Sequence, residues 1–226
     1  MENSALKTKN VTKYFHDPVT IPVLKNINLD VKKGEFVSIV GKSGCGKSTL
    51  LYVLSTMDSD YEGELEINGT LVTGLSLNAL AKIRNESIGF VFQFHYLLPD
   101  FSCLKNVMIP GLRLGKYSVK EVEQRAYEKL KMFGVEELAL KNANRLSGGQ
   151  QQRVAIARAL INDPAIIMGD EPTGNLDSKN TGIVFDLFQK LSKEYGQTLI
   201  TVTHDEDFAK RSDRIIEMAD GEILKH

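Results

Sequence analysis

Hydrophobic and polar residues follow the rhythm of strands and tight turns in the first third of the chain. Apolar residues alternate with polar ones over residues 27–31, and residues 36–40 have the largely apolar composition of a buried strand. Residues 47–54 then predict a helix. Around Asn68-Gly69, the apolar positions of residues 65–72 predict a hairpin with a two-residue turn.

The middle of the chain changes to a helical pattern. Ser118 and Glu121 form the sequence of a capping box. Behind it, apolar residues recur at spacings of three and four over residues 119–133, and Gly134 ends the predicted helix. A second helix is predicted over residues 151–161, and the Asn-Asp-Pro sequence that follows ends it. We therefore predict a helical lobe over residues 94–160.

The last third returns to alternating strands and helices. Residues 165–169 predict a short buried strand, residues 183–191 an amphipathic helix, and residues 198–203 a second strand. A final hairpin is predicted to turn at Asp220-Gly221. This alternation indicates an α/β fold with a mostly parallel sheet, whose ligand sites lie at the carboxyl ends of its strands.

The whole pattern fits one domain over residues 1–226. Residues 1–93 and 161–226 would form the α/β core, with its antiparallel hairpins, and the helical lobe would be inserted between them. The 28 basic and 29 acidic residues nearly balance, so a nucleic-acid partner is not expected. No apolar stretch approaches the roughly 18 residues that span a bilayer, so any membrane role would come through a partner.

Residues 41–49 fit the glycine-rich phosphate-binding loop with the pattern G-x-x-x-x-G-K-[ST]. Its glycines let successive N–H groups point at phosphate oxygens, and the following helix adds its positive end. Lys47 would reach the β- and γ-phosphates, and the Ser48 hydroxyl would ligate Mg²⁺. The predicted nucleotide-binding residues of this loop are Gly41, Lys42, Ser43, Gly44, Cys45, Gly46, Lys47, Ser48 and Thr49.

Two adjacent acids, Asp170 and Glu171, follow the strand predicted at residues 165–169. Paired acids are usually part of a solvated loop, but here an apolar strand precedes them and Pro172-Thr173-Gly174 breaks the chain after them. Asp170 would hold Mg²⁺ through its water shell, and Glu171 would orient or activate the attacking water as general base. The pair therefore predicts a catalytic site.

A second anion site is predicted at Leu146-Ser147-Gly148-Gly149-Gln150, where a hydroxyl and free amides stand at the start of a helix. This motif follows the phosphate-binding loop by about a hundred residues. With that spacing, nearly the whole chain resembles the ATPase subunit of an ABC transporter. The resemblance implies the P-loop NTPase fold of ABC ATPases, hydrolysis of ATP with Mg²⁺, and a homodimer. In that dimer the motif of one copy caps the ATP held by the loop of the other.

The resemblance also implies roles for residues that the chemistry alone would not single out. Gln93 would contact Mg²⁺ and the attacking water, although a glutamine after a strand is normally solvated. His204 would contact the γ-phosphate, although such a histidine is more often a helix cap. Tyr14 would stack on adenine, the alternative being a core aromatic residue. The family's loop across the dimer interface would be Asn175, Leu176 and Asp177.

Residues 92–99 and 174–177 resemble one branch of the family in particular. That branch serves lipoprotein release, macrolide and peptide export, antimicrobial-peptide resistance and cell division. It implies an integral-membrane permease as partner and a peripheral location on the cytoplasmic face of the inner membrane. The alternatives are an importer ATPase and a regulatory clamp of a membrane complex with little turnover. Members of the family that act on DNA or ribosomes typically carry paired cassettes or long coiled-coil insertions. Such a function is disfavoured here, because the chain has one cassette and only about fifty residues separate Gln93 from Ser147.

Overall fold

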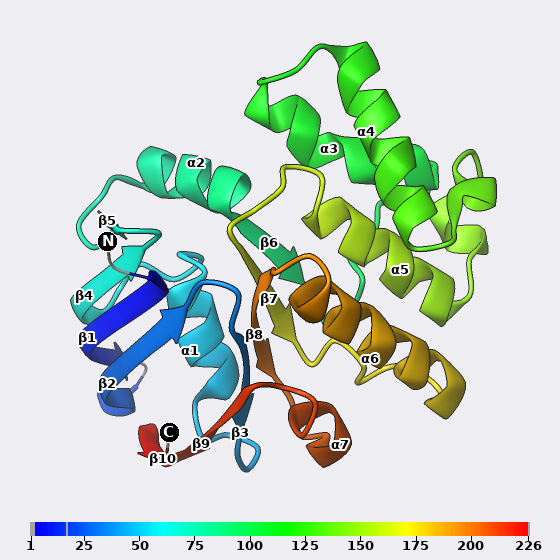
Figure 1. Cartoon of the computed structure of the whole chain (residues 1–226). Coiled ribbons are helices and arrows are strands. Elements are labelled where there is room, and N and C mark those ends of the chain that lie inside the picture. Colours follow the sequence, from blue (N-terminus) through cyan, green and yellow to red (C-terminus); the bar gives the residue numbers. More distant parts are fainter. Residues whose placement is uncertain (1–2, 17, 226) are drawn as a thin grey trace. The chain divides into compact units, whose positions relative to one another are not determined.

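The computed structural model describes residues 3–16 and 18–225 and divides into two compact units (Figure 1). The first unit comprises residues 1–81 and 189–226, and the second comprises residues 82–188. The unit boundaries fall within helix α2 (Leu77–Ser87) and helix α6 (Ser178–Lys193). Among the described residues, no helix is both long and apolar enough to cross a membrane.

The first unit contains an antiparallel sheet in the order β2-β1-β4-β5 (Figure 1). Its strands are β1 (Ser4–Phe15), β2 (Ile21–Lys32), β4 (Glu62–Ile67) and β5 (Thr70–Leu71). Ile27, Leu29 and Val31 are buried while Asn28 is exposed, which confirms the predicted alternation. The predicted hairpin is also confirmed, because Asn68 and Gly69 both have positive φ angles, 49° and 79°.

The first unit also contains strands β3 (Phe36–Val40), β8 (Thr198–Val202), β9 (Arg214–Ala219) and β10 (Glu222–Lys225). β3 pairs in parallel with both β8 and β9, and β10 forms the predicted terminal hairpin with β9. Helix α1 (Lys47–Leu54) and the short helix α7 (Glu206–Ala209) complete this unit. Phe36 of β3 and Phe208 of α7 pack edge to face, with ring centroids 5.8 Å apart.

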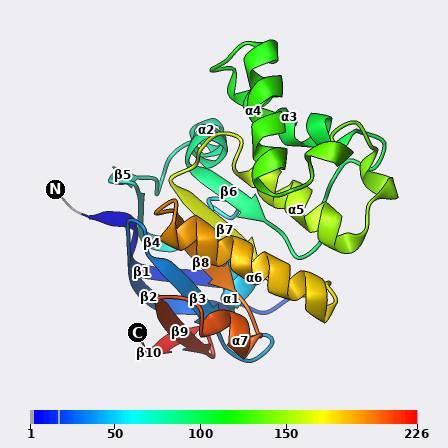
Figure 2. The same ribbon diagram turned by 45° about the vertical axis from the view of Figure 1, so that its right-hand side comes forward.

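The second unit contains two parallel strands and a group of helices (Figures 1 and 2). The strands are β6 (Ile88–Val91) and β7 (Ile166–Asp170), and the helices are α3 (Cys103–Leu114), α4 (Val119–Met132) and α5 (Gly148–Ala159). Two short 3₁₀ helices cover Glu136–Leu138 and Ala143–Arg145. Helices α3, α4 and α5 contact one another, as Figure 2 shows, and all three lie within residues 94–160.

The start of α4 confirms the predicted capping box. The Ser118 hydroxyl accepts from the backbone N–H of Glu121, and the Glu121 carboxylate accepts from the backbone N–H of Ser118 over 2.8 Å. After the helix, Gly134 has a φ of 61°, as expected of a residue that ends a helix. One part of the predicted stripe is wrong: Val119 is 64% exposed, because it lies in the first turn, while Val122 is buried.

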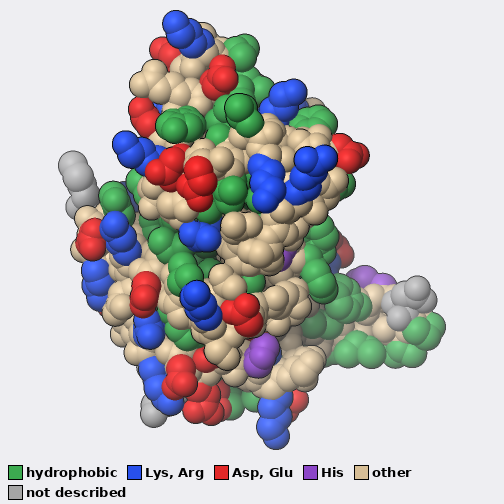
Figure 3. Space-filling model, turned by 90° about the vertical axis from the view of Figure 1, so that its right-hand side faces the viewer, with side chains coloured by type: hydrophobic (Ala, Val, Ile, Leu, Met, Phe, Trp, Pro, Cys, Tyr) green, Lys and Arg blue, Asp and Glu red, His purple; other side chains and the backbone are tan. Residues whose placement is uncertain are grey.

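Acidic and basic side chains are intermingled on the face drawn in Figure 3. This distribution agrees with the near-zero net charge of −1.

Candidate functional site

The predicted phosphate-binding loop joins β3 directly to α1 in the first unit. Gly46 caps α1 with a φ of 102°, a conformation that a residue with a side chain rarely adopts. At Gly41, an added Cβ would lie 2.2 Å from the backbone oxygen of Met218. The loop therefore needs glycine at these positions because its backbone is curled and lies close to the β9–β10 hairpin.

Lys47 lies at the first position of α1 and is only 8% exposed. Its Nζ donates to the backbone oxygens of Gly41 over 2.7 Å and Lys42 over 3.0 Å. The backbone oxygen of Cys45 accepts from the N–H of Gly221 over 3.1 Å. These contacts hold the ammonium group over the loop and tie the loop to the terminal hairpin.

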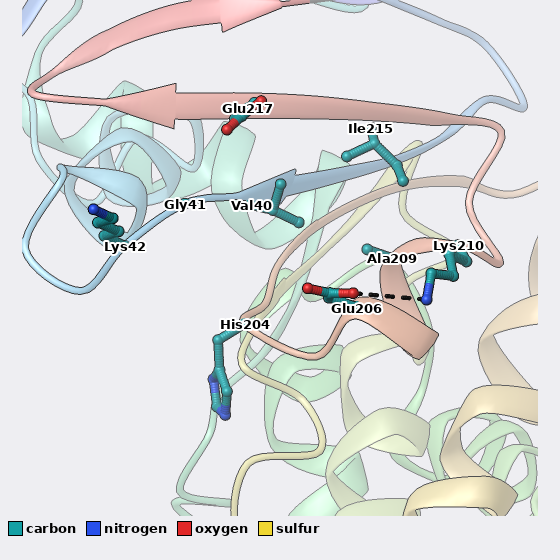
Figure 4. A pocket seen from close by; sticks show the side chains of 9 residues that line it. All are labelled: Val40, Gly41, Lys42, His204, Glu206, Ala209, Lys210, Ile215 and Glu217. Carbon is teal, nitrogen blue, oxygen red and sulfur yellow. Dashed lines mark ion pairs between the residues drawn. The ribbon is translucent and has the colours of Figure 1, made fainter.

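His204 lies at the same edge of the parallel strands as the phosphate-binding loop. Ile39 of β3 pairs with Val202 of β8, so His204 follows β8 at the level at which Gly41 follows β3. His204 is exposed. A cavity of about 470 Å³ opens there, with Gly41, Lys42 and His204 among its lining residues (Figure 4). The first unit therefore brings together two elements that the sequence predicted to act on one phosphate group.

Residues of α7 and β9 also line this cavity (Figure 4). Glu206 of α7 forms an ion pair with Lys210 over 3.7 Å, and Ile215 and Glu217 come from β9. Just before α7, the Asp205 carboxylate caps the helix by accepting from the N–H groups of Asp207 and Phe208. Asp205, and not His204, therefore caps this helix.

Tyr14 lies near the end of β1, opposite Pro22 of β2. Its half-buried ring stacks against His16, with ring centroids 6.2 Å apart and an interplanar angle of 29°. A ring in this position is partly open to solvent rather than part of the core. Its role in adenine binding stays a prediction.

In the second unit, the register of β6 and β7 places Gln93 beside the turn that contains Glu171. Val91 pairs with Gly169, so Gln93 and Glu171 each lie two residues beyond that pair. The backbone oxygen of Gln93 accepts from the Asn175 side-chain amide over 3.0 Å. A Cβ added to Gly174 would lie 3.0 Å from Gln93 Nε2. Gln93 is therefore packed against the turn after the acid pair.

Asp170 is the last residue of β7 and is 8% exposed. Glu171 follows with a φ of 46°, which is uncommon for a residue with a side chain. The N–H of Gly174 donates to the backbone oxygen of Glu171 over 3.0 Å and closes a turn. Gln152 of α5 donates its side-chain amide to the backbone oxygen of Pro172 over 2.5 Å.

The LSGGQ motif begins α5, as predicted, and its glycines belong to the first turn of the helix. Ser147 is the N-cap, and its hydroxyl accepts from the N–H of Gln150 over 3.4 Å. The Gln150 side chain accepts from the backbone N–H of Ser147 over 3.0 Å, which makes a second capping box. Leu146 is buried, whereas Ser147 and Gly148 are exposed. The helix ends at Ala159, two residues before the predicted end.

The predicted interface loop packs against this motif. A Cβ on Gly148 would lie 3.8 Å from Leu176 Cδ2, and Gly149 lies directly against Asn180 of α6. The Asp177 carboxylate accepts from both the backbone N–H and the side-chain amide of Asn180. These hydrogen bonds, the backbone one foremost, hold the pKa of Asp177 below its ordinary value. The motif and the loop therefore form one packed cluster.

The stretch after Gln93 is fixed to the same helix. The guanidinium of Arg158, in the last turn of α5, donates to the backbone oxygens of His95 and Tyr96, each over 2.7 Å. Burial, with a smaller contribution from Arg158, lowers the pKa of His95. The neutral imidazole is thus favoured near neutral pH, where an unperturbed histidine is partly charged.

The family model for ABC transporters matches residues 24–174, which is more than half of the chain. The chain belongs to the ABC transporter family. It is an ATPase, with the ATP-binding cassette that the phosphate-binding loop and the LSGGQ motif predicted.

Similar proteins cover this ABC ATPase almost from end to end. The lipoprotein-releasing system ATP-binding protein LolD of Bacteroides thetaiotaomicron is 49% identical over 97% of the chain and 99% of its own length. The protein of the same name from Francisella tularensis is 46% identical over 99% of the chain and 97% of its own length. Among solved structures, the dimeric ABC transporter cassette MJ0796 has a TM-score of 0.89 at 47% identity, with 97% of both chains covered. A post-hydrolysis dimer of MJ0796, with ADP and Pi bound, has the same TM-score.

Sequence reasoning missed two residues of this ABC ATPase that support the predicted site. Asn180 packs on Gly149, and Gln152 holds the backbone oxygen of Pro172. The sequence does not single out Gln152, because its neighbours Gln150, Gln151 and Arg153 are also polar. Asn180 carries a weak signal, the Asp-x-x-Asn spacing of a helix start.

Proposed function

We propose that this ABC ATPase is the ATP-hydrolysing subunit of a lipoprotein-releasing transporter. The observation that carries the proposal is the end-to-end similarity to LolD proteins, at 49% identity over 97% of the chain and 99% of the relative. The sequence predicted this branch from residues 92–99 and 174–177. These two segments contact each other through the hydrogen bond from the Asn175 side chain to the Gln93 oxygen. Export of peptides or drugs by the same branch is the nearest alternative.

ATP would bind to the first unit. The backbone of residues 41–49 would hold the phosphates, Lys47 would move from its two backbone acceptors to the β- and γ-phosphates, and Tyr14 would stack on adenine. The His204 side chain would contact the γ-phosphate. Its place beside Gly41 and Lys42 in the same cavity supports this role.

Mg²⁺ would be held by Ser48, Gln93 and Asp170. Their hydroxyl, amide and carboxylate oxygens are the hard ligands that Mg²⁺ prefers. In the part of the chain that the structure describes, no group of three His, Cys, Asp or Glu residues could hold a metal. Mg²⁺ in nucleotide sites usually takes most of its ligands from water and substrate phosphates, and it would neutralise phosphate charge when bound.

Glu171 would serve as general base, or at least orient the attacking water, and Gln93 would assist it. Both follow the carboxyl ends of parallel strands, where α/β proteins place their catalytic groups. The unusual backbone of Glu171 supports the assignment, because such strain gathers at active sites.

A second copy of the chain and an integral-membrane permease would complete the transporter. The exposed Ser147 and Gly148 at the N-terminus of α5 offer a hydroxyl and amides to the phosphates of an ATP bound by the other copy. The dimeric structures of MJ0796 support a two-fold assembly of this kind. Attached to its permease, the chain would lie on the cytoplasmic face of the inner membrane as a peripheral subunit.

The proposed cargo is tested by reconstitution. Tagged Glu171→Gln protein with Mg·ATP should trap the assembled transporter in detergent extracts of native membranes, and mass spectrometry identifies the permease. Wild-type chain and that permease, in vesicles loaded with a triacylated lipoprotein, should release it when ATP is added. ATP-dependent export of a soluble peptide without lipoprotein release would contradict the proposal. Capture of a many-span permease with a solute-binding protein would indicate an importer.

The proposed chemistry is tested separately in the purified chain. Glu171→Gln should bind ATP but release phosphate at least about a hundredfold more slowly, the lower end of what one general base contributes. Lys47→Ala should weaken ATP binding, because a hydrogen bond to a charged group contributes about 1.5–3 kcal/mol. Wild-type turnover in Glu171→Gln would contradict the catalytic assignment without affecting the proposed cargo.

A further inference from the structure

Gln152 is a buried polar residue that the proposed reaction does not use. It lies in the first half of α5, two residues after the LSGGQ motif, and is 1% exposed. Its Nε2 donates to the backbone oxygen of Pro172 over 2.5 Å. Its Oε1 is buried and has no hydrogen-bond partner among the described residues. A leucine or methionine would fill this position without an unsatisfied oxygen, so the amide needs a reason other than packing.

The bond to Pro172 acts on the residue directly after Glu171. Glu171 has a φ of 46°, and it precedes a proline, which further restricts its backbone. Backbone of this kind persists only where neighbouring contacts determine it. Here the N–H of Gly174 donates to the Glu171 oxygen over 3.0 Å, and the N–H of Leu176 donates to the Thr173 oxygen over 3.1 Å. The Pro172 oxygen, between them in the chain, accepts from the Gln152 side chain.

The orientation of the amide follows from this contact. Turning the amide over would place Oε1 against the oxygen of Pro172, where two acceptors repel, so Nε2 must face Pro172. Gln152 therefore connects α5 to the turn through a hydrogen bond in which only its Nε2 can be the donor. The two other backbone bonds close the turn on itself, whereas Gln152 ties it to the helix that the LSGGQ motif begins.

We infer that Gln152 is a positioning residue for hydrolysis: it holds the turn that presents Glu171 and links that turn to the LSGGQ helix. The inference rests on the proposed role of Glu171. It predicts that α5 and the Glu171 turn move together, so that a contact made at Ser147 or Gly148 also fixes the position of the carboxylate. Loss of the link would lower turnover without weakening ATP binding.

The test compares two methionine substitutions on the same helix. Gln152→Met keeps the length of the side chain and removes both the bond to Pro172 and the unsatisfied oxygen. Gln151→Met is the matched control, because Gln151 donates to the backbone oxygen of Ala143 over 3.0 Å rather than to the turn. For Gln152→Met we expect kcat to fall about tenfold, as for a slightly misplaced catalytic group, with the KM for ATP unchanged. The Tm should fall, because the Pro172 oxygen loses its partner. Gln151→Met should keep the wild-type kcat.

A second comparison separates this inference from the role of Glu171. If Gln152 acts through Glu171, the double variant Glu171→Gln, Gln152→Met should turn over no more slowly than Glu171→Gln alone. Wild-type turnover in Glu171→Gln would overturn the role of Glu171 itself. A wild-type kcat in Gln152→Met, an equal loss in Gln151→Met, or an additive loss in the double variant would overturn the inference. Should Gln152→Met not fold, Gln152→Asn gives the same test with a polar side chain too short to keep the bond.

Discussion

Gly149 and Asn180 are in direct contact, and the contact leaves no room for a side chain on the glycine. A Cβ on Gly149 would lie 1.9 Å from Asn180 Oδ1 and 2.9 Å from Asn180 Cβ. Asn180 cannot simply rotate away, because its amide donates to both carboxylate oxygens of Asp177 over 2.9 Å. The first turn of α5 and the start of α6 are therefore fitted to each other at this point.

Gly149→Ala should destabilise the protein, since the methyl group forces α5 and α6 apart or breaks the bonds between Asn180 and Asp177. We expect a loss of about 1–3 kcal/mol, the usual cost of an extra methyl group in a tight contact. Gly148→Ala is the control, because its Cβ would meet Leu176 at an ordinary distance of 3.8 Å. Urea unfolding measures both variants. Equal stability of the two variants would contradict the claim that the Gly149–Asn180 contact leaves no room for a methyl group.

Asn175 tests whether the position of Gln93 depends on the loop after Glu171. Its side-chain amide donates to the backbone oxygen of Gln93 over 3.0 Å, and removing it frees Gln93 from that loop. We expect Asn175→Ala to lower kcat several-fold while the Tm changes little, because Asn175 is exposed. Ser178→Ala, at an exposed position just beyond the loop, is the control for steady-state phosphate release. An unchanged kcat in Asn175→Ala would show that Gln93 does not need this bond.

The elements set by local sequence could be predicted, and those set by distant contacts could not. The helix at residues 47–54 and the capping box at Ser118 depend on neighbouring residues, and both predictions were confirmed. Helix α3 lies in the predicted helical lobe, but its bounds were not predicted, and Pro110 lies inside it. Its place in the fold depends on tertiary packing, because Asn85 and Asn162 both donate to the Pro110 oxygen and Gly111 lies against Val122.

The same division applies to the candidate site. The phosphate-binding loop, the acid pair and LSGGQ are contiguous motifs, so they could be located by residue type and spacing. The support of Gln152 for Pro172 and the contact of Asn180 with Gly149 join residues far apart in the sequence. No periodicity within either helix indicates the partner of such a contact. Only the pairing of elements in the fold defines it.

Asp163 makes part of the stability depend on pH. Burial alone would raise its pKa, but hydrogen bonds from Lys129 and Arg125 lower it below the ordinary value of 3.8. Its contribution is therefore present above about that value and is lost as pH falls through the lower, folded pKa. Asn is the best replacement, because it tolerates the φ of 48° at this position.

Asp163→Asn should be less stable than wild type at pH 7 by about 0.2–1 kcal/mol, a small figure because the carboxylate is 57% exposed. The difference should shrink toward zero as pH falls below the lowered pKa of the folded carboxyl, where wild-type Asp163 also becomes neutral. Urea unfolding at several pH values measures it, with Asp100→Asn, at an exposed position, as the control. A difference that stays constant with pH would contradict an ionic contribution.

Asn106 is the last test, because one buried side chain there fixes the loop that follows Gln93. It is 0% exposed; Oδ1 accepts from the N–H of Leu98 over 2.7 Å, and Nδ2 donates to the oxygens of Leu98, Phe101 and Ser102. Asn106→Leu keeps the shape but leaves these groups without a partner, and each one left buried costs about 1–3 kcal/mol. We therefore expect a loss of at least about 2 kcal/mol in urea unfolding. Asn144→Ala, at an exposed position, should change stability by less than about 0.5 kcal/mol. If Asn106→Leu is as stable as Asn144→Ala, water must satisfy the backbone groups that Asn106 bonds in the wild type. The loop is then not fixed by Asn106.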